Sequence, residues 1–175
     1  MPPLLMRLLG TFPVDEKGAF LSPDIPEGHY AVTVGGLPPT AYVADIRFGA
    51  ASVFDNGIDI GGQPQPLQVV VAADGATVQG IVVSKSRPMP NVTVVLVPPE
   101  PRRKNTLLYK SVVADNNGKF KIQAVAPGSY TVFAWQNVVP GAWQNAEFLQ
   151  KYWSQGKPVT AQRGGNVELE MEMIP

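Results

Sequence analysis

The sequence lacks cysteine entirely and contains a single histidine, His29, among its 175 residues. Without cysteine, neither a disulfide nor a thiolate nucleophile can form, and one histidine cannot supply a histidine-rich zinc site. His29 stands between Gly28 and Tyr30 at the expected start of a strand, where we interpret it as a surface residue. These absences exclude Cys–His dyads and the usual zinc enzymes, so we predict a non-enzyme without a metal or other cofactor.

Net charge is also lacking, because 14 basic residues balance 14 acidic ones. No overall field therefore favours nucleic acid or an anionic membrane. One basic cluster, Arg102-Arg103-Lys104, stands among prolines, and we interpret it as a solvated loop. No apolar run reaches the roughly 18 residues of a membrane span, and the start, MPPLLMRLLG, shows no signal-peptide cleavage site. We expect neither a nucleic-acid partner nor a membrane span.

Glycine and proline, in contrast, are abundant, with 17 and 18 residues. They punctuate the chain about every eight to twelve residues, as many short strands require. No helical pattern alternates with the strands, which argues against a parallel α/β sheet. The pattern predicts an all-β, immunoglobulin-like antiparallel sandwich in the C-terminal half. The expected strands there are residues 77–84, 91–97, 107–114, 119–123, 129–135, 157–161 and 167–173.

One segment, residues 145–153, carries a helical pattern instead. Asn145 is suited to cap the first turn, and Gly156 and Pro158 are suited to end the helix. We therefore predict one short helix in an otherwise β-rich chain.

The stretch DNNGKFKIQAVAPGSYTVFAW, which begins at Asp115, has a looser copy, DEKGAFLSPDIPEGHYAVTV, which begins at Asp15. The repeat extends to residues 67–71 and 167–171, so it covers a whole structural unit. The counterparts of strands 77–84 and 91–97 would lie before residue 1. We predict two tandem sandwich units, residues 1–74 and 75–175, of which the first is incomplete at its N-terminus, and we expect the chain to be a fragment of a longer protein.

The residues shared by the two copies have structural explanations. An Asp can accept a backbone N–H two residues later, and a glycine supplies the positive φ of a tight turn. A tyrosine at the start of a strand can return its hydroxyl to the backbone as a sandwich corner. The predicted turn, core and corner residues are Asp15, Gly18, Phe20, Gly28 and Tyr30 in the first copy and Asp115, Gly118, Phe120, Gly128 and Tyr130 in the second. The phenylalanines should fall on the core side of the following strand.

The segments GATVQGIVV, PMPNVTVVLVP and ADNNGKFKIQAVAPGSYTVFAW resemble the carboxypeptidase regulatory-like domain. The resemblance is strong over residues 77–135 and looser over 14–72. It implies a transthyretin-like, or prealbumin-like, sandwich of the carbohydrate-binding-like kind. It also implies a non-catalytic accessory role in a bacterial envelope or secreted protein, as in acidobacterial tandem copies, and hence a location outside the cytoplasm. The implied partners are other domains of the same parent protein or a cell-surface polysaccharide.

Two functions remain open. The first is a structural or interaction module, in which the aromatic residues after residue 134 extend the core. The alternative is a carbohydrate-binding module, because sugar-binding sandwiches place flat aromatic faces against pyranose rings with amides as hydrogen-bond partners. The candidate ligand-binding residues are Trp135, Trp143, Tyr152, Trp153, Gln136, Asn137 and Gln144. Exposed and coplanar Trp143 and Trp153 would favour sugar binding, whereas their burial would remove its support.

Overall fold

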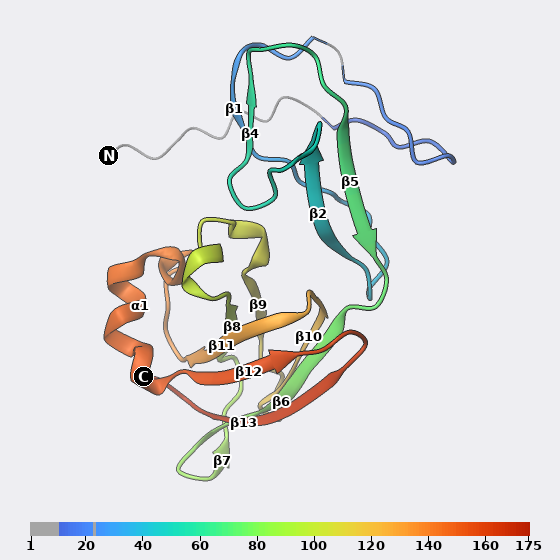
Figure 1. Ribbon diagram of the computed structural model, residues 1–175. Coiled ribbons are helices and arrows are strands. Elements are labelled where there is room, and N and C mark those ends of the chain that lie inside the picture. The colour runs from blue at the N-terminus through green and yellow to red at the C-terminus, as the bar shows by residue number, and fades with distance from the viewer. Residues whose placement is uncertain (1–10, 23) are drawn as a thin grey trace.

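The computed structural model of the chain describes residues 11–22 and 24–175. The expectations for the first ten residues lie outside this range. The described chain is built almost wholly of short strands, which form two β-rich parts joined near residue 74 (Figure 1). The N-terminal part contains β1 (Gly28–Tyr30), β2 (Tyr42–Phe48), β3 (Ala51–Ser52), β4 (Ile58–Ile60) and β5 (Leu67–Ala72). The all-β prediction is confirmed.

The C-terminal part is a sandwich of two four-stranded sheets, one ordered β10–β6–β13 with β7 attached to β6, the other β12–β11–β8–β9. Its strands are β6 (Ala76–Ser84), β7 (Arg87–Pro88), β8 (Thr93–Val97), β9 (Lys110–Val113), β10 (Lys119–Val125), β11 (Gly128–Trp135), β12 (Lys157–Ala161) and β13 (Asn166–Glu172). The inward-facing residues of both sheets alternate with outward-facing ones and form one apolar core. Val78, Val94, Phe120, Ile122, Val132 and Met171 are among its members.

One pair of neighbouring strands is parallel, whereas the prediction was an antiparallel sandwich. β13 runs parallel to β6, in register from Asn166 opposite Thr77 to Glu172 opposite Val83. An all-antiparallel arrangement is therefore wrong for this sheet. A parallel pair needs a long crossover connection, and here the whole of the intervening sandwich supplies it.

Several element boundaries also differ from the prediction, and 3₁₀ turns explain two of the differences. The expected strand 107–114 begins only at Lys110, because Thr106–Leu108 form a 3₁₀ turn capped by the side chain of Asn105. The predicted helix is α1 (Ala146–Tyr152), and Trp153–Gln155 continue it as a 3₁₀ turn. Asn145 caps α1 as expected, since its Oδ1 accepts the N–H of Phe148 at 3.0 Å.

The repeated stretch has the same hydrogen bonds in both copies. Asp15 Oδ1 accepts the N–H groups of Lys17 and Ala19, each at 2.8 Å. Asp115 Oδ1 accepts those of Asn117 and Lys119, also each at 2.8 Å. Both turns place a glycine at positive φ, 81° at residue 18 and 74° at residue 118.

The two tyrosine corners also match each other. The hydroxyl of Tyr30 donates to the carbonyl of Pro26 at 2.7 Å, and that of Tyr130 donates to the carbonyl of Ala126 at 2.9 Å. Each corner follows a glycine with φ above 150° at the start of the strand. The sequence repeat is therefore a repeat of turn and corner geometry.

Among the described residues, the N-terminal part has fewer strand neighbours than the second copy. β11 pairs with both β12 and β8, whereas the three-residue β1 pairs with β4 alone of the described strands. Phe120 lies on β10, which pairs with β6. Phe20 does not lie on a strand, contrary to the prediction. In the second copy β6 pairs with the strand that carries Phe120, and no described strand of the first copy takes the place of β6 beside Phe20. Phe20 remains half-buried.

The two corners allow a matched stability test. Tyr130 is only 5% exposed, whereas the hydrogen bond of Tyr30 is exposed to solvent. We expect Tyr130→Phe to lower the free energy of unfolding by about 1 kcal/mol and Tyr30→Phe by less than about 0.5 kcal/mol, since an unsatisfied acceptor costs more when buried. Urea unfolding followed by far-UV circular dichroism measures both, and equal losses would contradict this explanation.

Burial raises the pKa of the Tyr130 phenol, because the phenolate is disfavoured in the core. The folded state therefore holds this proton more tightly than the unfolded state, whose phenol titrates near pH 10. The resulting stabilisation is complete below about pH 10 and is lost as the pH rises further. We expect unfolding free energy to fall less steeply above pH 10 in Tyr130→Phe than in the parent chain. An identical slope would contradict the assignment.

Candidate functional site

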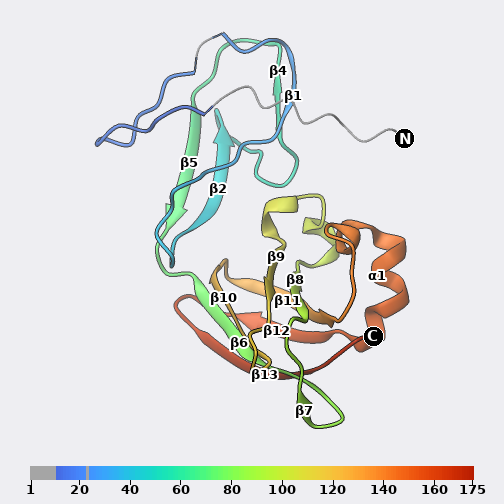
Figure 2. The same ribbon diagram turned by 180° about the vertical axis from the view of Figure 1, so that it is seen from behind.

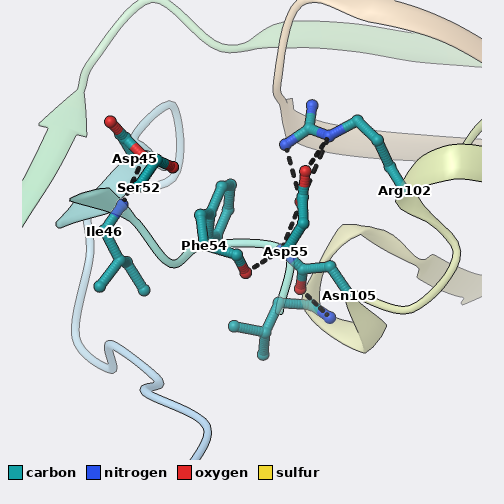
Figure 3. Close-up of polar contacts among 8 residues, drawn as sticks. Asp45, Ile46, Ser52, Phe54, Asp55, Arg102 and Asn105 are labelled. Atoms are coloured by element: carbon teal, nitrogen blue, oxygen red, sulfur yellow. Dashed lines mark hydrogen bonds and ion pairs between the residues drawn. The ribbon is translucent and has the colours of Figure 1, made fainter. Parts of the chain in front are cut away.

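A cluster of polar contacts joins the two β-rich parts at a point distant in sequence from the linker. Arg102 of the β8–β9 loop reaches Asp55 of the β3–β4 loop, with Nε 3.1 Å from Oδ2 and Nη2 3.2 Å from Oδ1 (Figure 3). Asn105 Nδ2 donates to the carbonyl of Phe54 at 2.8 Å and to Asp55 Oδ1 at 3.2 Å. We name these four residues, Phe54, Asp55, Arg102 and Asn105, the clamp.

Asn105 is the central residue of the clamp because it organises both sides. It is 5% exposed, and it is the one buried polar residue of the described chain. Its Oδ1 accepts the N–H of Leu107 at 3.1 Å, which fixes the 3₁₀ turn, while its amide donates across the junction. A buried amide must find partners for both its donor and its acceptor, and here they come from two different parts of the chain.

The ion pair between Arg102 and Asp55 contributes more to the relative orientation of the two loops than to stability. The side chains of Arg102 and Asp55 are 33% and 34% exposed, so solvent screens their attraction, which is worth about 1 kcal/mol. The Arg102 guanidinium also lies 5.6 Å from the centroid of the Phe54 ring. Several hydrogen bonds in fixed geometry, together with this contact, hold the two loops at one relative position.

The linker forms a second, separate attachment. Gly75 donates its N–H to the carbonyl of Thr40 at 2.9 Å. A Cβ at residue 75 would lie 2.6 Å from that oxygen and 2.7 Å from Ala124 Cα, so only glycine fits between the two parts. Asp74 accepts the Tyr42 hydroxyl at 3.2 Å. Its own carbonyl accepts the N–H of Gly164 at 2.6 Å.

Two attachments restrict motion in a way that one cannot. A short linker alone would leave the two parts free to rotate about it. In this structure the linker is packed from both sides, and the clamp joins the parts at a second place. The β3–β4 loop and the β8–β9 loop, which carry the clamp, face each other in both ribbon views (Figures 1 and 2). The two parts are therefore in contact at two separate places.

Of the seven residues predicted for ligand binding, Trp135, Trp143 and Tyr152 lie in a second apolar cluster beneath α1. Trp135 is 1% exposed and Trp143 is 9% exposed, so neither offers a face to a ligand. Trp135 stacks on Phe133 with ring centroids 5.0 Å apart, and Tyr152 packs against it edge-on. Gln136, Asn137 and Gln144 are exposed. Trp135, Trp143 and Tyr152 thus extend the core, and Trp143 and Trp153 do not form the exposed pair that would favour sugar binding.

Trp153 differs from the other two tryptophans because it is 42% exposed. The guanidinium of Arg103 lies 4.4 Å above its ring, and Arg103 Nε donates to the carbonyl of Pro98 at 3.3 Å. The prediction of a merely solvated basic loop is therefore wrong, because Arg102 belongs to the clamp and Arg103 stacks on Trp153. Of the three, Lys104 is the one classed as exposed, whereas Arg102 and Arg103 are half-buried.

Sequence reasoning missed the clamp for an identifiable reason. Asp55 is followed by Asn56 and Gly57, which form a common turn signature, and Arg102 stands in a charged, proline-rich loop. Each of the two segments has a local explanation as a turn or a loop, and neither sequence indicates that the two segments contact each other. The available signal was Asn105, an amide two residues before the apolar pair Leu107 and Leu108.

The described residues offer little to catalysis. Nowhere in residues 11–22 and 24–175 do three or more His, Cys, Asp or Glu side chains gather in a way that could hold a metal ion. His29 Nδ1 lies 2.7 Å from Asp59 Oδ1, but both side chains are largely exposed, at 51% and 86%. Within the same part of the chain, no helix has the length and hydropathy needed to cross a bilayer.

Comparison with known proteins gives a family match over part of the chain. Residues 73–150, less than half of the chain, match the family model described as polysaccharide lyase family 4, domain II. No curated protein matches the chain by sequence.

Solved structures show only distant similarity. A DUF3823 family protein from Parabacteroides merdae is 19% identical over 59% of this chain and 48% of its own, with a TM-score of 0.41. A candidate carbohydrate-binding protein from Pseudomonas aeruginosa is 13% identical over 57% and 88%, with a TM-score of 0.39. The major pilin subunit BcpA of Bacillus cereus is 13% identical over 61% and 31%, with a TM-score of 0.37. This chain thus spans less than half of the first and third of these proteins.

The clamp makes a specific prediction about Asn105. In Asn105→Asp, the turn-capping acceptor is kept, but a carboxylate replaces the amide that faces Asp55 Oδ1 and the Phe54 carbonyl. We expect a loss of about 2 kcal/mol in unfolding free energy at pH 7, because like charges and an unpaired acceptor meet in a buried place.

The same variant should recover stability in acid. Burial and Asp55 would raise the folded-state pKa of the introduced carboxyl, so its penalty is present at neutral pH and shrinks as the pH falls toward about 4. Asn105→Ala, which introduces no titrating group, is the control. Thermal unfolding at pH 7 and pH 4.5, referenced to the parent chain, measures the difference. Parallel pH dependence of the two variants would contradict the proposed contact.

Proposed function

We propose that the chain is a non-catalytic structural module in which two β-sandwich units, residues 1–74 and 75–175, are held at a fixed angle to one another. The observation that carries this proposal is the double attachment of the units through the packed linker and the clamp. A module of this kind sets the distance and orientation between whatever lies on its two sides.

The wider setting follows from the sequence resemblance. The turn, core and corner pattern supports a carboxypeptidase regulatory-like identity for the second unit, with the first as its incomplete copy. That resemblance supports an extracytoplasmic position in a bacterial envelope or secreted protein. The partners are then neighbouring domains of the same parent protein, and sugar binding by the buried tryptophans is disfavoured by their burial.

Distance measurements between the units test this function directly. The chain has no cysteine, so spin labels can be placed at two introduced cysteines without background. Gln63→Cys and Asn116→Cys put labels on exposed residues of the first and second unit, away from the clamp. Double electron–electron resonance should give one narrow distance distribution for the parent chain and a broad one when Arg102→Ala removes the ion pair.

Lys104→Ala is the matched control, since Lys104 is a neighbouring exposed cation and takes no part in the ion pairs of the described residues. Its distribution should stay narrow. A broad distribution in the parent chain would refute the fixed angle, and an unchanged distribution in Arg102→Ala would show that the clamp does not maintain it.

A further inference from the structure

A groove of about 550 Å³ lies on the outer face of the second sandwich, where strands β11 and β12 meet the end of α1. Its volume falls within the range of about 300–1,000 Å³ that is typical of ligand sites. It is lined by Glu100, Arg103, Ser129, Thr131, Gln150 and Trp153, among others. None of these residues belongs to the clamp, so the groove is a separate feature of the molecule.

The groove exists because α1 covers only one end of β11. Ser129, Thr131, Phe133 and Trp135 share the outer face of this strand, since side chains alternate along a strand. Phe133 and Trp135 are fully buried in the cluster beneath α1, whereas Ser129 is exposed and Thr131 is half-buried. The uncovered end of the strand therefore presents two hydroxyl groups to solvent.

Trp153 is fixed in place at the side of this groove. Its ring packs against Phe133 with centroids 5.7 Å apart. The chain then passes close over β11 at Gly156, where a Cβ would lie 2.5 Å from Thr131 Cγ2. Trp153 thus keeps 42% of its surface exposed while being anchored on the buried cluster.

Arg103 is held over Trp153 without forming an ion pair among the described residues. Its guanidinium stacks 4.4 Å above the ring, and its Nε is occupied by the carbonyl of Pro98. The ion pairs found among the described residues do not include Arg103. The remaining guanidinium N–H groups are therefore preorganised donors at a fixed position, which lowers the entropic cost of binding.

We propose that this groove binds a neutral oligosaccharide. Sugar hydroxyls both donate and accept hydrogen bonds. In the groove, Arg103 is a donor and Glu100 an acceptor. The side chains of Ser129, Thr131 and Gln150 can each donate and accept. The exposed part of the Trp153 ring provides apolar surface for the sugar C–H groups. One cation and one anion leave the groove without net charge, which favours a neutral chain over a polyanion. The inference is independent of the fixed angle between the units.

Calorimetric titration and tryptophan fluorescence test the groove with defined probes. The probes are cellohexaose, xylohexaose, mannohexaose, laminarihexaose and maltohexaose, with a galacturonic acid hexamer as the charged comparison. We expect at least one neutral hexamer to bind and to change the emission of Trp153, the one exposed tryptophan of the three. Trp153→Ala and Gln150→Ala should each weaken binding, the first by at least tenfold.

Arg103→Lys keeps the charge but loses the planar donor fork, so it should also weaken binding several-fold. The paired variant Gln136→Ala with Asn137→Ala is the control, because these exposed amides lie outside the groove and should leave affinity unchanged. Unfolding midpoints verify that each variant is folded. Binding to none of the neutral hexamers, binding of the galacturonic acid hexamer alone, or equal loss in the control would each overturn the proposal.

Discussion

The arrangement of this molecule depends on one buried amide, that of Asn105, which bonds to two parts of the chain at once. Its oxygen orders the β8–β9 loop and its nitrogen reaches the Phe54 carbonyl and Asp55. Because an unpaired buried amide is costly, both sets of bonds must form together or be lost together. The loop geometry of one unit is therefore coupled to the position of the other, and Arg102 adds a directional ion pair to the same carboxylate.

Much of the second unit could be predicted from its sequence because its signals are local. The Asp115 turn, the Tyr130 corner and the cap at Asn145 each involve residues within four positions of one another, and glycine at positive φ marks the turn. What could not be predicted depends on distant segments. The parallel pairing of β13 with β6 joins strands about ninety residues apart, and sequence periodicity carries no information on strand direction.

The first unit shows how far a shared pattern determines structure. Its turn and corner form with the same hydrogen bonds as in the second unit, although β1 pairs with β4 alone among the described strands whereas β11 pairs with both β12 and β8. The strand after the turn does need a neighbouring strand. Phe120 lies on β10, paired with β6, while the corresponding Phe20 stands outside any described strand. A strand gains most of its stability from pairing and packing, whereas a turn gains it from its own residues.

The three tryptophans near the C-terminal end differ in burial, and this difference could not be predicted from composition. Trp135 and Trp143 build a second core beneath α1, and Trp153 remains at the surface beside Arg103. The sequence places all three within nineteen residues, from 135 to 153, and their exposure depends on where α1 ends on the sheet. The candidate groove follows from that partial cover, because β11 continues beyond the end of the helix.

The central claim, that the two units move as one body, is tested most directly by ¹⁵N relaxation of the whole chain. The account predicts one rotational diffusion tensor that fits the amides of β2, β4 and β5 together with those of β6 to β13. Separate tensors, with a shorter correlation time for the smaller first unit, would contradict it.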